Sequence, residues 1–89
     1  MHTAIVHSSV DMTRLNEAIA GIDSVKQRLS TSKGFKAAYW LAPNDGHGMA
    51  VILWEDEAAA RAAAFPVGSS PARGVTIERI DIRPVIAQA

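Results

Sequence analysis

The chain has 89 residues, with nine lysine and arginine side chains balanced by nine aspartate and glutamate side chains, so its formal net charge at pH 7 is zero. This length predicts one domain, and the balanced charge argues against a nucleic-acid-binding protein, which needs clustered lysine and arginine. The chain has no cysteine, which excludes disulfides, thiol nucleophiles and zinc knuckles.

The ends and the apolar runs of the chain predict its location. Residues 1–4 have neither a basic region nor a long apolar region, so we expect no signal peptide. The longest run of large apolar residues, 49–54, is far too short for a membrane span. We therefore expect a cytoplasmic protein with neither a membrane nor a nucleic acid as partner.

The N-terminal part predicts a strand and then a helix. Residues 2–8 favour a strand because they include β-branched side chains and are followed by turn-forming residues. Asp11 and Thr13 are both suitable helix caps, and the sequence does not choose between them. Gly21 favours a kink in the helix, and Gly34 ends the segment. The helix carries one apolar stripe, formed by Leu15, Ile19, Ile22, Val25 and Leu29.

The middle of the chain predicts a β-hairpin. Residues 35–42 and 48–54 are rich in apolar side chains, and Asp45-Gly46 between them is a preferred pair for a type I′ turn. If this turn has two residues, Tyr39 pairs with Ile52.

The last part predicts a second helix and a final strand. Asp56 is a good cap for the alanine-rich helix 58–65. In the strand 74–86 the apolar phase slips by one residue, which indicates a β-bulge near Glu78-Arg79, and Pro84 restricts its end to a sheet edge.

The element order is therefore β-α-β-β-α-β. This order predicts a ferredoxin-like α+β sandwich, an antiparallel sheet with two helices on one face, as one domain over residues 1–89.

Both faces of the predicted hairpin are apolar, although the helices can cover only one of them. Alternate residues of the first strand are Phe35, Ala37, Tyr39 and Leu41 on one face, and Lys36, Ala38, Trp40 and Ala42 on the other. Large apolar surfaces seldom stay exposed on a monomer. We expect a second copy of the sheet to cover the outer face, in a homodimer with Trp40 at its interface.

The stretch from Lys33 to Leu41, followed by Val51 to Arg61 with Trp54-Glu55 at the strand end, resembles the antibiotic biosynthesis monooxygenase (ABM) family of the dimeric α+β barrel superfamily. The shared pattern is a glycine after the first helix, an apolar strand, a turn, and a strand that ends in Trp-Glu before a short helix. The resemblance covers roughly residues 33–61. It implies a homodimer whose sheets form a barrel and, in each subunit, a pocket between sheet and helices.

The resemblance also implies two kinds of chemistry. Some relatives oxygenate aromatic polyketides without metal or flavin, by reaction of a deprotonated substrate with O₂. Others degrade haem with an asparagine, a tryptophan and a helix-borne histidine. Trp54 matches that tryptophan, but the three histidines, at positions 2, 7 and 47, lie outside both predicted helices. We therefore expect no haem, no metal and no other cofactor.

The predicted hairpin register places an aromatic pocket beside Trp54. Tyr39, Phe35 and Ile52 would share its face and contact a planar substrate, with the Trp54 indole as a catalytic group. The alternative is that Trp54 only closes the core. Trp40 would take the opposite face.

Two further polar residues are candidates. His7, at the end of the first strand, is a candidate general base, or else a half-exposed strand-end side chain. Arg79, at the predicted bulge, is the arginine that we expect to turn inward and bind the substrate. His47, in the hairpin, is expected to be solvated.

The first function hypothesis is a small cofactor-independent monooxygenase that acts on a planar aromatic or polyketide-like compound. The alternative is a non-catalytic ligand-binding or stress-associated dimeric α+β barrel protein, whose pocket would lack acid–base groups. A third reading is a structural module with a filled core and no pocket. A cavity, and the directions of Tyr39, Trp54 and His7, would discriminate between these hypotheses.

Overall fold

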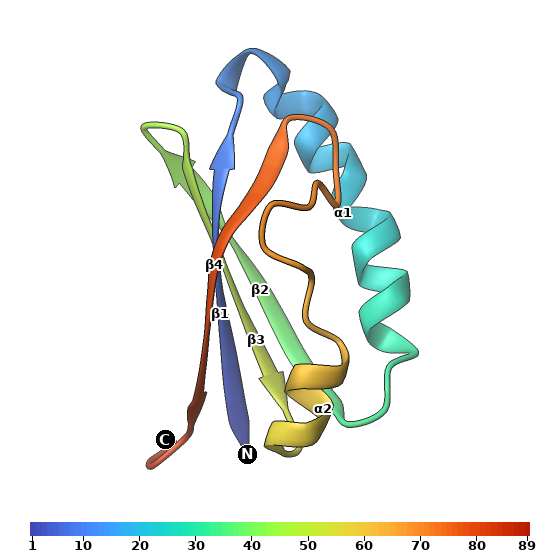
Figure 1. Cartoon of the computed structure of the whole chain (residues 1–89), viewed down its shortest axis with the longest axis vertical. Coiled ribbons are helices and arrows are strands. Elements are labelled where there is room, and N and C mark those ends of the chain that lie inside the picture. Colours follow the sequence, from blue (N-terminus) through green and yellow to red (C-terminus); the bar gives the residue numbers. More distant parts are fainter.

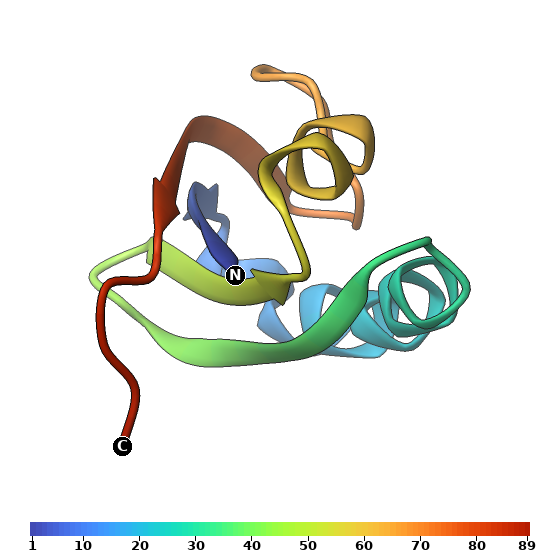
Figure 2. The ribbon, with the colours of Figure 1, turned by 90° about the horizontal axis from the view of Figure 1, so that it is seen from below.

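A computed structural model describes all 89 residues and confirms the predicted fold class. An antiparallel four-stranded sheet, in the order β2-β3-β1-β4, carries both helices on one face (Figures 1 and 2). The strands are β1 (His2–Val10), β2 (Phe35–Asn44), β3 (His47–Trp54) and β4 (Val75–Pro84). The helices are α1 (Leu15–Ser30), preceded by a 3-10 turn at Met12–Arg14, and α2 (Glu57–Ala62). β1 extends two residues beyond its predicted end, so Ser9, which was expected in the turn after the strand, belongs to the strand.

The core lies between the sheet and the helices. Trp54 and Leu29 are its largest fully buried side chains, each 1% exposed. Trp54 packs edge-on against Phe35, with the ring centres 5.7 Å apart. The other buried core residues come from both layers: Ala4, Val6, Ala50, Ile52, Ala60 and Ile77. The even-numbered residues of β1 and β3 therefore face the helices, and the odd-numbered ones form an outer face.

Helix α1 begins after a capped turn and is continuous through Gly21. The Asp11 side chain accepts hydrogen bonds from the backbone N–H and the hydroxyl of Thr13, at 3.0 and 2.6 Å, so Asp11 is the cap. These two bonds and the nearby Arg14 charge lower the pKa of Asp11. At Gly21, an added Cβ would lie 2.6 Å from the Cβ of Ala72, so the glycine lets the segment before β4 pack directly on the helix.

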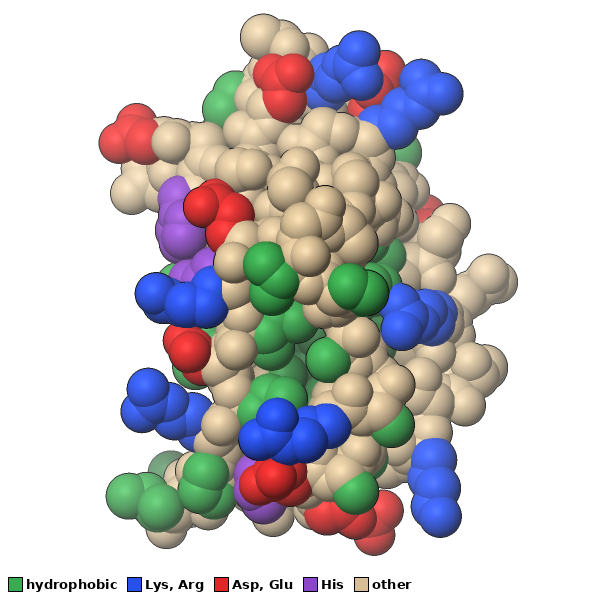
Figure 3. Space-filling model, in the orientation of Figure 1, with side chains coloured by type: hydrophobic (Ala, Val, Ile, Leu, Met, Phe, Trp, Pro, Cys, Tyr) green, Lys and Arg blue, Asp and Glu red, His purple; other side chains and the backbone are tan.

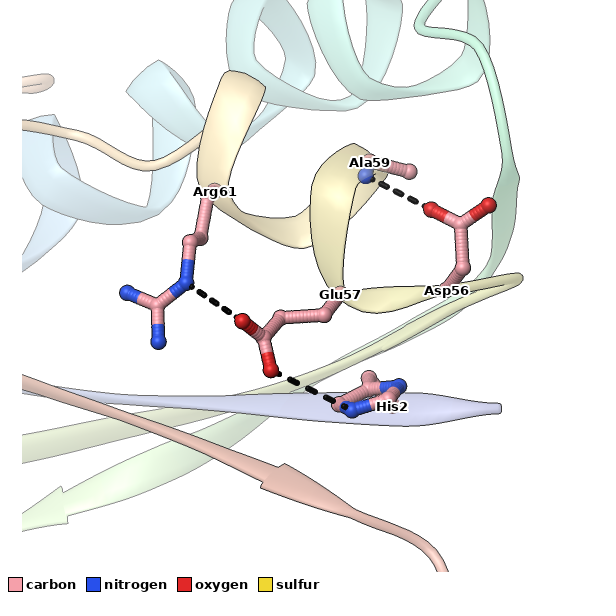
Figure 4. A network of polar contacts seen from close by, with 5 residues as sticks. All are labelled: His2, Asp56, Glu57, Ala59 and Arg61. Atoms are coloured by element: carbon pink, nitrogen blue, oxygen red, sulfur yellow. Dashed lines mark hydrogen bonds and ion pairs between the residues drawn. The ribbon is translucent and has the colours of Figure 1, made fainter.

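Helix α2 is shorter than predicted but starts at the predicted cap. The Asp56 carboxylate accepts a hydrogen bond of 2.8 Å from the N–H of Ala59 (Figure 4). Beside it, the Glu57 carboxylate accepts a bond of 2.9 Å from Arg61 Nε and lies 3.7 Å from His2 Nε2. The bond from Arg61, its charge and that of His2 lower the pKa of Glu57. This network ties α2 to the start of β1.

The hairpin turn between β2 and β3 forms as predicted, but the register beyond it does not. Asp45 and Gly46 both have positive φ, 51° and 76°, as a type I′ turn requires. The strand pairing then shifts by one residue, because Ala42 and Pro43 together stand opposite Gly48. Proline has no N–H to donate to a ladder and is found at bulges and edges. This bulge exchanges the two faces of β2.

Two more irregularities complete the sheet. Lys36 is an extra residue in β2, which returns Phe35 to the inner face opposite Trp54. In β4, His7 pairs with Arg79 while Ser8 pairs with Ile77, so Glu78 is bulged. The predicted bulge at Glu78-Arg79 is therefore confirmed.

A candidate ligand cleft between the sheet and helix α1

A cleft of about 120 Å³ lies between the sheet and α1. Its floor comes from β1, β3 and β2, its roof from the apolar stripe of α1, and its side from Phe65 and the segment at Pro71 and Ala72. Figure 3 shows hydrophobic side chains gathered in a hollow beside β4 and the segment that follows α2. The pocket that the ABM resemblance implied is thus present in this single chain.

Small residues on β3 make the space. Gly48 and Ala50 lie in the floor, and both are buried. The neighbouring strands contribute larger walls there, with Trp40 on β2 opposite Ala50. On the roof, Ala18 of α1 is a buried small residue on the same side of the helix as the apolar stripe. The role of Gly48 and Ala50 was not predicted; the available signal was a Gly or Ala at alternate positions of the apolar strand β3.

No charged or titratable side chain lines the cleft, and 16 of its 20 residues are hydrophobic. Its polar side-chain atoms are the Ser8 hydroxyl and the Trp40 indole nitrogen. The cleft is therefore suited to holding an uncharged, mostly apolar molecule against aromatic and aliphatic walls. It offers no side chain for general acid–base catalysis at neutral pH.

The structure reverses the predicted positions of two aromatic residues. Tyr39 pairs with Val51 rather than Ile52, lies on the outer face and is 58% exposed, so its expected position beside Trp54 is wrong. Trp40, expected at a dimer interface, lies on the helix side and lines the cleft instead. The physical reason is the bulge at Pro43, which shifts the register by one residue.

The other predicted hydrophobic contacts lie on the inner face. Ile52 lines the cleft. Phe35 and Trp54 share that face as predicted, but they pack on each other in the core and are not part of the cleft lining. Trp54 is fully buried, so its position is that of the core residue that the sequence analysis gave as its alternative.

The predicted polar site residues lie on the opposite side of the sheet. His7 faces outward, with its Nδ1 3.4 Å from His47 Nε2 and its Nε2 3.1 Å from Arg79 Nη2. Asp81 completes the group, 3.4 Å from both His7 Nε2 and Arg79 Nε. Arg79 is thus not turned inward as expected, because it pairs with His7 across the ladder. His47 is exposed as predicted and contacts His7.

A second recess, of about 500 Å³, lies between the end of α1 and α2. It is lined by charged side chains of both signs, among them Arg28, Lys33 and Glu55, and by several alanines of α2. It lacks the continuous apolar wall of the cleft, so we treat the cleft as the candidate site.

A comparison with solved structures supports the fold. The chain is similar to MhuD, in a crystal structure of a mutant with two manganese protoporphyrin IX bound per active site. The TM-score is 0.74 at 18% sequence identity, over 100% of this chain and 98% of that chain. No protein-family model matches the sequence, and no curated protein matches it. Neither helix is long and apolar enough to cross a membrane.

A porphyrin does not fit the residues of this cleft. None of the three histidines is in its lining, so no axial ligand faces the space, and no lysine or arginine is present to pair with the propionates. No group of three or more metal-binding side chains occurs in the chain. At 18% identity the likeness shows the fold, and the chain therefore has the ferredoxin-like α+β fold that its resemblance to the ABM family implied.

Proposed function

We propose that this protein binds a small, planar, uncharged aromatic compound in the cleft between the sheet and α1. The observation that carries the proposal is a cleft lined by hydrophobic side chains and free of titratable groups. Apolar walls with few polar atoms are typical of small-molecule sites. Trp40 and Phe65 supply aromatic faces on which a planar ring can stack. This is the ligand-binding alternative of the sequence analysis.

Filling the cleft tests the proposal. Ala18 is buried in the roof, whereas Ala20 is exposed on the same helix. Ala18→Leu places extra side-chain volume in the cleft, and Ala20→Leu is its matched control. Naphthalene, titrated against tryptophan fluorescence, is expected to quench the wild type and the control, because Trp40 lines the cleft. The Ala18→Leu variant is expected to lose this response.

The response must come from the cleft tryptophan. Trp54 is buried outside the cleft lining, so a Trp40→Phe variant keeps one reference indole that the ligand does not touch. Equal quenching in wild type, Ala18→Leu and Trp40→Phe would show that naphthalene binds elsewhere and would contradict the proposal.

Oxygenation of the bound compound is the second candidate function. The aromatic wall at Trp40 favours it, since it can hold a planar phenol away from water. Because no titratable side chain lines the cleft, the substrate proton must pass to water, which requires an acidic polyphenol. In the balanced reaction the polyphenol, in its keto form, loses two hydrogen atoms from one ring carbon, gains one oxygen atom of O₂ there as a quinone carbonyl, and the other oxygen atom leaves as water. Oxygen uptake with such a polyphenol is the test. A rate that Ala18→Leu leaves unchanged would refute catalysis in the cleft. A role for His7 or Trp54 in this reaction stays a prediction.

We also propose that the outer face of the sheet forms a homodimer. This face carries half-buried or exposed hydrophobic side chains at Ile5, Tyr39, Val51 and Leu53. A contiguous apolar patch of this kind marks an interaction surface, and zero net charge offers little repulsion. Light scattering at micromolar concentration is expected to give twice the mass of the chain. Val51→Lys, in the middle of the patch, is expected to give the monomer. A monomeric wild type would refute the interface.

A further inference from the structure

The Ser8 hydroxyl is a polar group inside the apolar cleft that the fold leaves without a partner. Ser8 is 8% exposed and is the buried polar residue of the chain. Ser8 lines the cleft, and its hydroxyl takes part in none of the side-chain hydrogen bonds of the structure. The fully buried side-chain atom without a partner is His2 Nδ1, so the Ser8 hydroxyl, in a residue that is almost covered, keeps some open surface at the cleft. A hydroxyl that no protein group pairs and that opens onto an apolar cleft is free to form a hydrogen bond with a molecule bound there.

Gly48 fixes the place of this hydroxyl. Gly48 stands opposite Ser8 in the ladder between β1 and β3. A Cβ at position 48 would lie 2.6 Å from Ser8 Oγ and 2.9 Å from the Val10 side chain. The hydroxyl therefore occupies the space that any other side chain at position 48 would fill. Ser9, the next residue, points to the outer face and is exposed, so the polar group is confined to one point of the floor.

From this placement, and resting on the proposed function, we propose that Ser8 is the polar anchor of the cleft and selects ligands that carry one uncharged hydrogen-bonding oxygen or nitrogen on an aromatic ring. A hydroxyl both donates and accepts, so it can pair with a phenol, a ketone or a ring nitrogen. The absence of charged lining residues disfavours a carboxylate in the same place. The Trp40 indole, which only donates, lies two strands away on the cleft wall and supplies a ring face rather than this pairing.

The test compares two probes that differ by one hydroxyl, 1-naphthol and naphthalene, on three proteins. Ser8→Ala removes the hydroxyl, and Ser9→Ala is the matched control on the outer face. Loss of one neutral hydrogen bond is expected to weaken 1-naphthol binding to Ser8→Ala about fivefold, while the naphthalene dissociation constant stays the same or falls. Ser9→Ala is expected to bind both probes like the wild type.

The outcomes separate the anchor from the cleft. If the wild type binds neither probe, the proposed function fails and the anchor fails with it. If it binds both, but Ser8→Ala weakens both equally or neither, the cleft is a binding site and the anchor is refuted.

The melting temperature of the ligand-free protein gives a second test of the Ser8 hydroxyl. Ser8→Ala is expected to melt at or above the wild-type temperature because the hydroxyl has no protein partner. A large fall in the melting temperature would show that the hydroxyl is bonded within the protein.

Discussion

Replacement of Gly21 by alanine tests whether the contact between α1 and the segment before β4 outweighs helix propensity. Gly21 lies in the interior of α1, where alanine is more favourable than glycine by about 1 kcal/mol. Its added Cβ would be 2.6 Å from the Cβ of Ala72 and 3.4 Å from the Cα. Carbon atoms in contact lie about 3.5–4.0 Å apart, so one of the two segments must move by about 1 Å.

The segment at Ala72 resists this movement. Its carbonyl accepts hydrogen bonds of 3.1 Å from the N–H of Val75 and 3.0 Å from the hydroxyl of Ser70. Overpacking of a fixed contact costs about 1–3 kcal/mol. After the gain in propensity is subtracted, Gly21→Ala is expected to destabilise the protein by about 1 kcal/mol, which lowers the melting temperature by about 4–8 °C.

Thermal and denaturant unfolding of four proteins measure this balance. Ala20→Gly, at an exposed position of the same helix, calibrates the propensity difference in this chain. The double variant Gly21→Ala with Ala72→Gly removes the close contact and is expected to recover the stability that Gly21→Ala loses. If Gly21→Ala raises the free energy of unfolding by the amount that Ala20→Gly lowers it, the contact with Ala72 does not affect stability and the reasoning is refuted.

Four further substitutions test the polar contacts of α2 and the packing at two glycines with positive φ. Arg61 lowers the pKa of Glu57, so this carboxylate stabilises the fold above its ordinary pKa of 4.5, and that stability is lost as pH falls through the lowered value. Glu57→Gln is expected to lose less thermal stability than the wild type between pH 7 and pH 3, and an unchanged pH profile would contradict the ion pair. Asp56→Ala removes the cap of α2 and is expected to cost about 1 kcal/mol in urea unfolding; a neutral result would show that the bond to Ala59 is not formed. Gly34→Ala and Gly68→Ala both replace glycines with φ above 75°, but a Cβ at Gly34 meets the Cβ of Ala59 at 2.7 Å and one at Gly68 meets nothing. Gly34→Ala is therefore expected to have a lower melting temperature than Gly68→Ala. Equal melting temperatures would show that the close contact with Ala59 does not destabilise the variant.

The sequence predicted those features that depend on local chemistry. The order of elements, the cap at Asp56, the turn at Asp45-Gly46 and the bulge at Glu78 are all found in the structure. Each depends on residues a few positions apart, whose side chains or backbone preferences act on their neighbours. The bulge in β4 could be predicted because one face of this strand is apolar and the other polar, so the sequence shows where the apolar residues change faces.

The positions of Tyr39 and Trp40 were not predictable by the same means. Both faces of β2 are apolar, so the hydrophobic pattern does not show which residues face the helices. The predicted register of β2 against β3 therefore depended on the length of the turn alone. Pro43 was the available signal, since a proline within a predicted strand indicates a bulge or an edge. The candidate site moved with this register: Trp40 entered the cleft, while His7 and Arg79 were found to pair on the outer face.

The irregularities of the sheet lie on its two edge strands, where they affect the capacity of the sheet to add further strands. The bulges at Lys36 and Pro43 lie on β2, and the bulge at Glu78 and the proline Pro84 lie on β4. These are the two edge strands, whose outward N–H and C=O groups would otherwise template strand addition by other chains. A chain without net charge has no electrostatic repulsion to keep such edges apart. Irregular edges make strand addition by another chain less favourable, which disfavours growth of the sheet into an open fibre.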